Sequence, residues 1–263
     1  MGAAEDWARD LASWAIPPDI LAKAPRNPWG WPIAQFVRAT EQAMTFSSPS
    51  LRRAREALAG DGGSVLDVGC GAGAASLPLC PPAGSIVGVD ESAEMLAAFD
   101  ELARARGIDH HTVRGRWPDV SGDVSAADVV VSNHVLYNVG DIEPFVVALA
   151  DHSRERTVIE ITSEHPRAWH APLWRALHGI DRPTKPTVDD LVIVLAELGI
   201  EAGVERWMHP TRMRDASLDE EVALVRAALC LNADRDLEIA AALRKHPPPA
   251  EREIATLWWD RDR

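Results

Sequence analysis

The chain has 263 residues, 46% of them hydrophobic, which is enough to form one α/β core with additions. Its 40 acidic residues outnumber its 27 basic ones, and the formal net charge of −13 would repel nucleic-acid phosphates and anionic membranes, so neither partner is expected. The three cysteines, Cys70, Cys80 and Cys230, lack the spacing of a zinc site or a disulfide framework, which predicts no bound metal and a reducing, cytoplasmic location.

Residues 1–50 are predicted to form a helical segment that is broken by prolines and is rich in aromatic side chains. We expect this segment to be a lid that folds over a ligand site and supplies an apolar wall for the ligand. The alternative is packing against the outside of the sheet, because tryptophans at helical spacing usually belong to a core. The aromatic residues concerned are Trp14, Trp29, Trp31 and Phe36.

The remaining residues, 51–263, are predicted to form the main domain. A helix is expected from Leu51 to Ala59, with Ser50 as its N-cap. From residue 64 onward, short β-branched runs alternate with helix-length segments, which is typical of a parallel sheet covered on both faces. Strands are expected at 64–68, 85–89, 109–114, 127–132 and 157–162, and helices at 74–79, 93–106 and 142–152.

The last part of the chain follows a different pattern. A Ser/Thr-x-x-acid motif at Thr187 predicts the start of a helix that runs to residue 198, and a strand can follow at 203–208. Residues 211–247 are predicted to hold two inserted helices, which would form another wall of the ligand site or a homodimer contact. A final strand at 254–259 would suit an antiparallel position at the sheet edge.

Three glycines, Gly69, Gly71 and Gly73, directly follow the first strand. Glycine tolerates positive φ and carries no Cβ, so such a turn lets the backbone approach a ligand closely. The helix expected at 74–79 would add unpaired amide donors beside the turn. With Ala74 in the third place, the turn also matches the G-x-G-x-x-G/A pattern of dinucleotide sites, so by itself it allows two nucleoside cofactors.

Two carboxylates flank this turn. Asp67 lies within the strand, where it would face a cationic ammonium group better than a pyrophosphate, which counts against a dinucleotide. Asp90 lies at the end of the next strand, where a carboxylate can accept both hydroxyls of an adenosine ribose, and this fits either cofactor.

The stretches LDVGCGAG at 66–73 and VGVDES at 87–92 resemble the first two motifs of class I S-adenosylmethionine-dependent methyltransferases. The resemblance covers about residues 51–162. It implies an α/β, Rossmann-like fold with a seven-stranded, mostly parallel sheet, an antiparallel last strand and helices on both faces. It also implies S-adenosylmethionine as the cofactor.

The resemblance implies roles for individual residues. The glycine turn would wrap the methionine part, Asp90 would hold the ribose, and Met95 would pack near the adenine. Arg116 departs from the family pattern at the adenine edge, because a guanidinium cannot accept a hydrogen bond from the adenine amino group. That contact would move to Asp119, to a backbone carbonyl or to water. The candidate cofactor residues are Asp67, Gly69, Gly71, Gly73, Asp90, Glu91, Met95, Arg116, Trp117, Ser132 and Asn133.

The stretch after the fourth strand looks like the family motif that borders the transferred methyl group. His134 is the first candidate for a general base and Tyr137 the second, with His165 and His170 as further candidates. A structural histidine beside the cofactor is the alternative for His134. We therefore expect a methyltransferase that acts on oxygen or nitrogen of a small-molecule acceptor. The alternatives are an NAD(P)-dependent oxidoreductase and a non-catalytic S-adenosylmethionine-binding protein.

Overall fold

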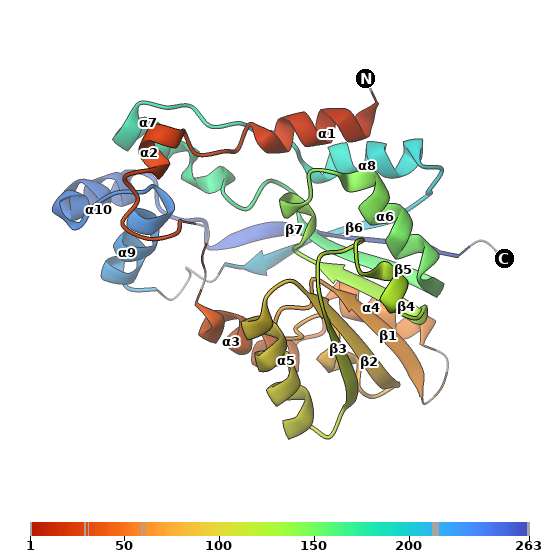
Figure 1. Ribbon diagram of the computed structural model, residues 1–263. Coiled ribbons are helices and arrows are strands. Elements are labelled where there is room, and N and C mark those ends of the chain that lie inside the picture. Colours follow the sequence, from red (N-terminus) through yellow and green to blue (C-terminus); the bar gives the residue numbers. More distant parts are fainter. Residues whose placement is uncertain are drawn as a thin grey trace.

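The computed structural model describes residues 2–28, 30, 32–58, 60, 62–211 and 216–261. Its centre is a seven-stranded sheet with the strand order β3-β2-β1-β4-β5-β7-β6, as Figure 1 shows. Neighbouring strands from β3 to β5 run parallel, whereas β7 runs antiparallel to both β5 and β6. The predicted fold class is confirmed. The strands are β1 (Gly63–Val68), β2 (Ala83–Asp90), β3 (Asp109–Arg114), β4 (Ala127–Asn133), β5 (Ser153–Thr162), β6 (Gly203–Pro210) and β7 (Glu251–Asp260).

The last strand does not lie at the sheet edge, so that part of the prediction was wrong. β7 lies between β5 and β6, and the edge is formed by β6. The run Ile254–Leu257 is fully buried, which requires cover on both faces, whereas β6 alternates between half-buried and exposed residues. An alternating strand tolerates an edge position better than a continuous apolar one.

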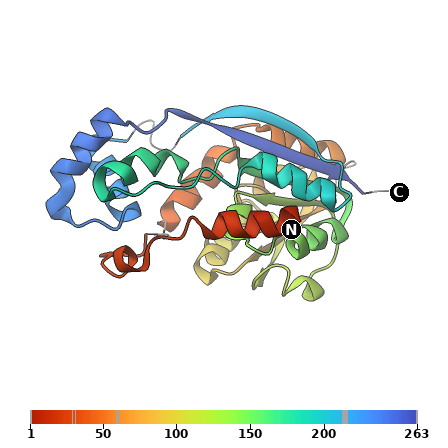
Figure 2. The ribbon, with the colours of Figure 1, turned by 90° about the horizontal axis from the view of Figure 1, so that it is seen from above.

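Helices cover both faces of the sheet (Figures 1 and 2). On one face, α6 and α8 pack against the sheet, and α1 lies outside them with Trp7 in the same core. On the other face lie α4 and α5. The capping box of Thr187 at the start of α8 is confirmed. The bounds are α1 (Ala3–Ala12), α3 (Ile33–Ala43), α4 (Pro49–Ala57), α5 (Ala93–Ala105), α6 (Ile142–Asp151) and α8 (Val188–Glu197).

Two local predictions were wrong. Residues 74–79 form turns and a short 3₁₀ helix at Leu77–Leu79 rather than an α-helix, because prolines at 78, 81 and 82 remove the amide donors that a longer helix needs. The glycine turn is therefore not followed by an α-helix N-terminus. The N-cap of α4 is Ser48, whose hydroxyl accepts from the Leu51 amide at 3.1 Å, and not Ser50.

A third core lies beside the sheet. Here α9 and α10 confirm the two predicted inserted helices, and they pack against α7 and the N-terminal Ile16. None of the helices described is long and apolar enough to cross a membrane. The remaining elements are α2 (Pro18–Leu21), α7 (Ala171–His178), α9 (Leu218–Ala228) and α10 (Asp236–Lys245), with short 3₁₀ helices at Ser121–Asp123, Leu136–Asn138, Ala168–His170 and Ala233–Arg235.

Candidate active site

The glycine turn follows β1 at the edge of the sheet where ligands of open α/β folds bind. Gly69, Gly71 and Gly73 have φ values of 72°, 51° and 91°, in the left-handed region that favours glycine. A Cβ on Gly73 would also lie 2.6 Å from Leu77 Cγ. By contrast, among the residues that the structure describes, a Cβ on Gly71 would meet only Phe36, at 3.5 Å. The turn therefore needs its glycines, and one side of it stays open except for an aromatic ring.

That ring belongs to α3, which lies against the turn. The hydroxyl of Thr40 is buried and donates to the carbonyl of Ala72 at 3.0 Å. Phe36, one helical turn earlier, lies beside Gly71. Of the predicted aromatic wall, Phe36 is thus at the turn, whereas Trp29 and Trp31 lie outside the described residues. The lid role of residues 1–50 remains a prediction.

Trp14 packs elsewhere, against His165. The two rings stack with centroids 3.8 Å apart, and the indole Nε1 donates to the carbonyl of Lys185 at 2.6 Å. Burial, together with the positive charge of Arg167, lowers the pKa of His165 to about 3. Burial also lowers the pKa of His170 to about 3. Bases this weak are poorly matched to neutral pH, so the structure argues against both histidines as general bases.

Asp67 is buried below the turn with no exposed surface. Its Oδ2 accepts from the Ser76 hydroxyl at 2.6 Å, whereas Oδ1 has no hydrogen-bond partner among the residues the structure describes. Burial raises the pKa of Asp67 to about 7, and the hydrogen bond from Ser76 offsets only part of this rise. An unpartnered buried carboxylate oxygen is costly, and a cationic ligand would satisfy it.

Asp90, at the end of β2, is bonded to the turn itself. Its Oδ2 accepts from the Gly71 amide at 2.9 Å and its Oδ1 from the Ser92 amide at 2.8 Å. The next loop joins here, because the Gly115 amide donates to the Asp90 carbonyl at 3.1 Å. Asp90 remains half-exposed and each of its oxygens has a lone pair left for a ligand. Three loops therefore meet at Asp90, two through its carboxylate and one through its backbone carbonyl.

The predicted adenine edge is only partly as expected. Met95 is half-buried at the start of α5, and Glu91 and Arg116 are exposed. Trp117 is buried in the core beneath α6, and its indole Nε1 donates to the Phe145 carbonyl at 3.3 Å. Its indole is thus used for packing, which leaves the backbone amide for any contact with an adenine.

The loop after β4 closes the site beside the turn. Val135 packs on the turn, since a Cβ on Gly69 would lie 3.2 Å from its Cγ1. Ser132 is buried and donates to the carbonyl of Val68 at 2.9 Å, so it ties β4 to β1. Asn133 has a buried Oδ1 without a hydrogen-bond partner in the described part of the chain. An unpartnered acceptor at this strand end is available for a donor on a ligand.

His134 contacts a carboxylate that the sequence analysis missed. Its Nε2 lies 3.1 Å from Oε1 of Glu160, and its side chain is 37% exposed. Burial alone would raise the pKa of Glu160, but the hydrogen bond and charge of His134, with a hydrogen bond from Ser50, hold it below its ordinary value. The signal in the sequence was a single acidic residue within the otherwise apolar run of β5.

Tyr137, the second predicted base, is a structural residue instead. Its hydroxyl is buried and donates to the Thr162 carbonyl at 2.9 Å, and its ring stacks on Trp7. Burial raises the pKa of this hydroxyl far above its ordinary value. It therefore stays protonated and turned into the protein, which contradicts a role as a base.

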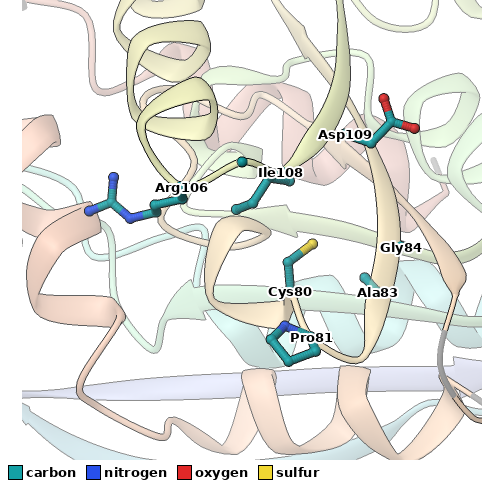
Figure 3. Close-up of a pocket in the computed structure, with 8 residues that line it drawn as sticks. Cys80, Pro81, Ala83, Gly84, Arg106, Ile108 and Asp109 are labelled. Atoms are coloured by element: carbon teal, nitrogen blue, oxygen red, sulfur yellow. The ribbon is translucent and has the colours of Figure 1, made fainter.

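A hollow of about 200 Å³ lies at the opposite edge of the sheet. Cys80, Ala83 and Gly84 line it before and within the start of β2, and Ile108 and Asp109 line it at the start of β3 (Figure 3). Because it lies at the amino ends of these strands, it is separate from the glycine turn and from Asp90.

The residues at the carboxyl ends of the parallel strands fit a nucleoside cofactor that carries an ammonium group. The turn allows close backbone approach, Asp67 offers an unpartnered buried carboxylate oxygen, and Asp90 stands at the end of β2 for a ribose. Residues 65–155 match the family described as methyltransferase domain. This stretch, about a third of the chain, is therefore similar to methyltransferase domains. Together with the sheet topology, this similarity favours a methyltransferase over a nicotinamide-dependent enzyme.

Similar proteins agree with this assignment. The chain is 30% identical over 105 residues to a ubiquinone biosynthesis O-methyltransferase from Rhizobium johnstonii. The aligned stretch covers 39% of this chain and 42% of that relative. The chain thus spans less than half the length of the curated relatives it matches.

Two solved structures show the same fold. A cyclopropane-fatty-acyl-phospholipid synthase-like protein from Lactobacillus casei is 18% identical, with a TM-score of 0.58 over 91% of this chain and 97% of that one. Magnesium protoporphyrin IX methyltransferase from Synechocystis, crystallised with S-adenosylhomocysteine, is 14% identical, with a TM-score of 0.51 over 85% and 83%.

Proposed function

We propose that this protein transfers a methyl group from S-adenosylmethionine to a hydroxyl oxygen of a small molecule, with His134 as the general base. The observation that carries the proposal is the half-exposed imidazole of His134, which is bonded to the buried carboxylate of Glu160 next to the glycine turn. Imidazole is the side chain best suited to accept a proton near neutral pH. The name of the Rhizobium relative, an O-methyltransferase, supports oxygen as the acceptor atom.

Bound S-adenosylmethionine would supply an electrophilic methyl group, and its sulfur would keep the electron pair of the bond to that methyl group. The protein's residues have two tasks in this reaction. The turn and Asp90 hold the cofactor, and the loop after β4 holds the acceptor in line with the methyl group. His134 takes the hydroxyl proton, so that the acceptor oxygen carries no positive charge in the product.

Aromatic side chains support an acceptor that contains a ring. Phe46 is 45% exposed, and its ring centroid lies 6.0 Å from that of Trp207 and 5.4 Å from that of His209. Trp207 is joined to the Glu160 neighbourhood, because its Nε1 donates to the hydroxyl of Thr256 at 3.2 Å. Exposed aromatic side chains of this kind stack favourably on planar ligands. A phenol is therefore the acceptor class we propose.

A substrate panel tests the proposal. The protein is incubated with S-adenosylmethionine and either simple phenols, such as catechol and 4-hydroxybenzoate, or the anilines of the same shape. Methylated product is then measured by mass spectrometry. O-methylated phenols with unchanged anilines are expected. Methylation of the anilines alone would overturn oxygen as the acceptor. If S-adenosylhomocysteine binds but no compound is methylated, the proposed function is wrong and a non-catalytic S-adenosylmethionine-binding protein is favoured.

Asp90→Ala is expected to weaken binding of S-adenosylhomocysteine by about 100-fold or more. The variant loses the charged carboxylate that would accept two hydrogen bonds from the ribose, and the glycine turn loses its anchor at the Gly71 amide. Isothermal titration calorimetry measures this loss. The matched control is Asp151→Ala, which removes an exposed carboxylate at the end of α6, away from the glycine turn, and should leave the affinity unchanged. Equal affinities of the Asp90 variant and the unaltered protein would remove Asp90 from the cofactor site.

We also infer a reducing, cytoplasmic location, which the free thiols of Cys70, Cys80 and Cys230 support. The predicted homodimer remains a prediction. The inserted helices α9 and α10 bury apolar surface against α7, and this packing accounts for part of their apolar faces.

A further inference from the structure

We infer that Glu160 is a positioning residue, whose carboxylate fixes one tautomer of His134 and leaves Nδ1 of His134 open to the acceptor, while a hydrogen-bond chain that begins at Trp207 holds the carboxylate in place. The inference rests on the proposed function, because that function gives the proton to His134. It adds a residue from β5 and three supporting residues from α4, β6 and β7, none of which lies near His134 in the sequence.

The backbone of His134 is held by the same residue as its ring. The His134 amide donates to the Glu160 carbonyl at 2.7 Å, while its Nε2 lies 3.1 Å from the Glu160 carboxylate. His134 has a φ of 60°, a conformation that is costly for a residue with a Cβ and that clusters at functional sites. Two contacts with one neighbour hold this conformation, so Glu160 fixes both the backbone position of His134 and the orientation of its ring.

The carboxylate of Glu160 is held in turn by two buried hydroxyls. Ser50 bonds to Glu160, and its Oγ lies 2.7 Å from Oγ1 of Thr256. An ionised carboxylate only accepts hydrogen bonds, so the single hydroxyl proton of Ser50 points to Glu160. Ser50 must therefore accept the proton of Thr256.

The first donor of the chain is an indole. Thr256 can give its proton to Ser50 because its oxygen accepts from Nε1 of Trp207, and an indole nitrogen can only donate. Every donor thus points from Trp207 through Thr256 and Ser50 to the carboxylate. The ring of Trp207 also lies beside Phe46, one of the aromatic side chains proposed to stack on the acceptor. The base and the acceptor region are consequently held by one set of bonds.

The ionised carboxylate of Glu160 fixes the tautomer of His134. Because the carboxylate only accepts, Nε2 carries the ring proton and Nδ1 keeps its lone pair. Nδ1 makes no hydrogen bond with any residue in the described ranges, and the ring is 37% exposed. This is the geometry in which an imidazole accepts a proton at one nitrogen while a carboxylate orients the other.

Nitrogen-15 NMR of the histidine-labelled protein without ligands tests the inference independently of activity. At about pH 8, where an ordinary imidazole is neutral, His134 should give separate signals for a protonated Nε2 and an unprotonated Nδ1. The His134 signals are assigned by their loss in His134→Asn. In Glu160→Gln the two signals should move toward each other as the tautomers mix, and kcat should fall about 100-fold with the KM for S-adenosylmethionine unchanged.

A matched pair of threonines controls for the effects of mutation. Thr256→Val removes the hydroxyl that supports Ser50 and should lower kcat about tenfold, because the Glu160 carboxylate is held less firmly, while the tautomer of His134 stays fixed. Thr157→Val removes an equally buried hydroxyl of β5 whose Oγ1 has no hydrogen-bond partner among the described residues, and it should change neither. Mixed tautomers in the unaltered protein, or unchanged ones in Glu160→Gln, would overturn the inference. Fixed tautomers in a protein that methylates no phenol would instead overturn the proposed function.

Discussion

Replacing Asp67 with Asn is expected to stabilise the free protein by about 2 kcal/mol at about pH 8. Burial raises the pKa of Asp67 from 3.8 to about 7, and such a rise costs the folded state about 4 kcal/mol once the carboxyl is ionised. The amide of Asn carries no charge, although its nitrogen lies where Oδ1 has no partner, which costs about 2 kcal/mol. Urea unfolding measures the difference.

The stabilisation depends on pH with a definite sign. Between about pH 4 and 7 the folded protein keeps a proton on Asp67 that the unfolded chain has lost, so this group makes the free energy of unfolding fall as the pH rises. The gain of the Asn variant should therefore be present at about pH 8 and lost at about pH 5. The control Asp128→Asn should have the opposite effect, because a backbone hydrogen bond from Ser64 lowers the pKa of Asp128.

The same substitution is expected to weaken binding of S-adenosylhomocysteine by about 100-fold, because the buried carboxylate loses its charge toward the ligand's ammonium group. In the unaltered protein the affinity should fall as the pH drops below about 7, by up to about tenfold per unit, since Asp67 must lose its proton to hold a cation. In the Asn variant this pH dependence should be absent. Calorimetry at several pH values checks both results, and an unchanged affinity would place the ammonium elsewhere.

The sequence predicted the parts of the fold that depend on local patterns. Short β-branched runs located the strands, and the spacing of Gly69 to Gly73 located a turn whose positive φ values need glycine. The order of β6 and β7 was missed, because it depends on which strand can bury both faces and not on either strand's place in the chain. The helix expected at 74–79 failed where the helix signal competed with Pro78 and the prolines that follow.

The candidate site likewise contains residues that a sequence motif reveals and residues that only the fold brings together. Asp67 and Asp90 lie close in sequence to the turn that they serve, and a motif could reveal them. Glu160, Ser50 and Thr256 come from three separate elements and meet only through the pairing of β5 with β7 and the packing of α4. Tyr137 was wrongly predicted as a base, because its place near His134 in the sequence does not determine which way its side chain points. Its hydroxyl points into the protein and donates to the Thr162 carbonyl.

His134→Asn is expected to lower kcat/KM for a phenol by about 100-fold to 10,000-fold, the range that a positioned general base supplies. Asparagine is the appropriate replacement because it tolerates the left-handed conformation at φ 60°, so the loop after β4 should keep its course. Affinity for S-adenosylhomocysteine should stay within about twofold, since a base acts on the acceptor and its loss is felt in the transition state.

The matched control is His110→Asn, which removes an imidazole that is likewise bonded to a carboxylate, that of Asp100 at 2.9 Å, but lies in β3 away from the glycine turn. It should leave kcat/KM unchanged. If His134→Asn keeps at least a third of the activity while binding the cofactor normally, proton removal is not assigned to this ring. Methyl transfer would then depend on positioning alone, and the contact between His134 and Glu160 would serve only to hold the loop.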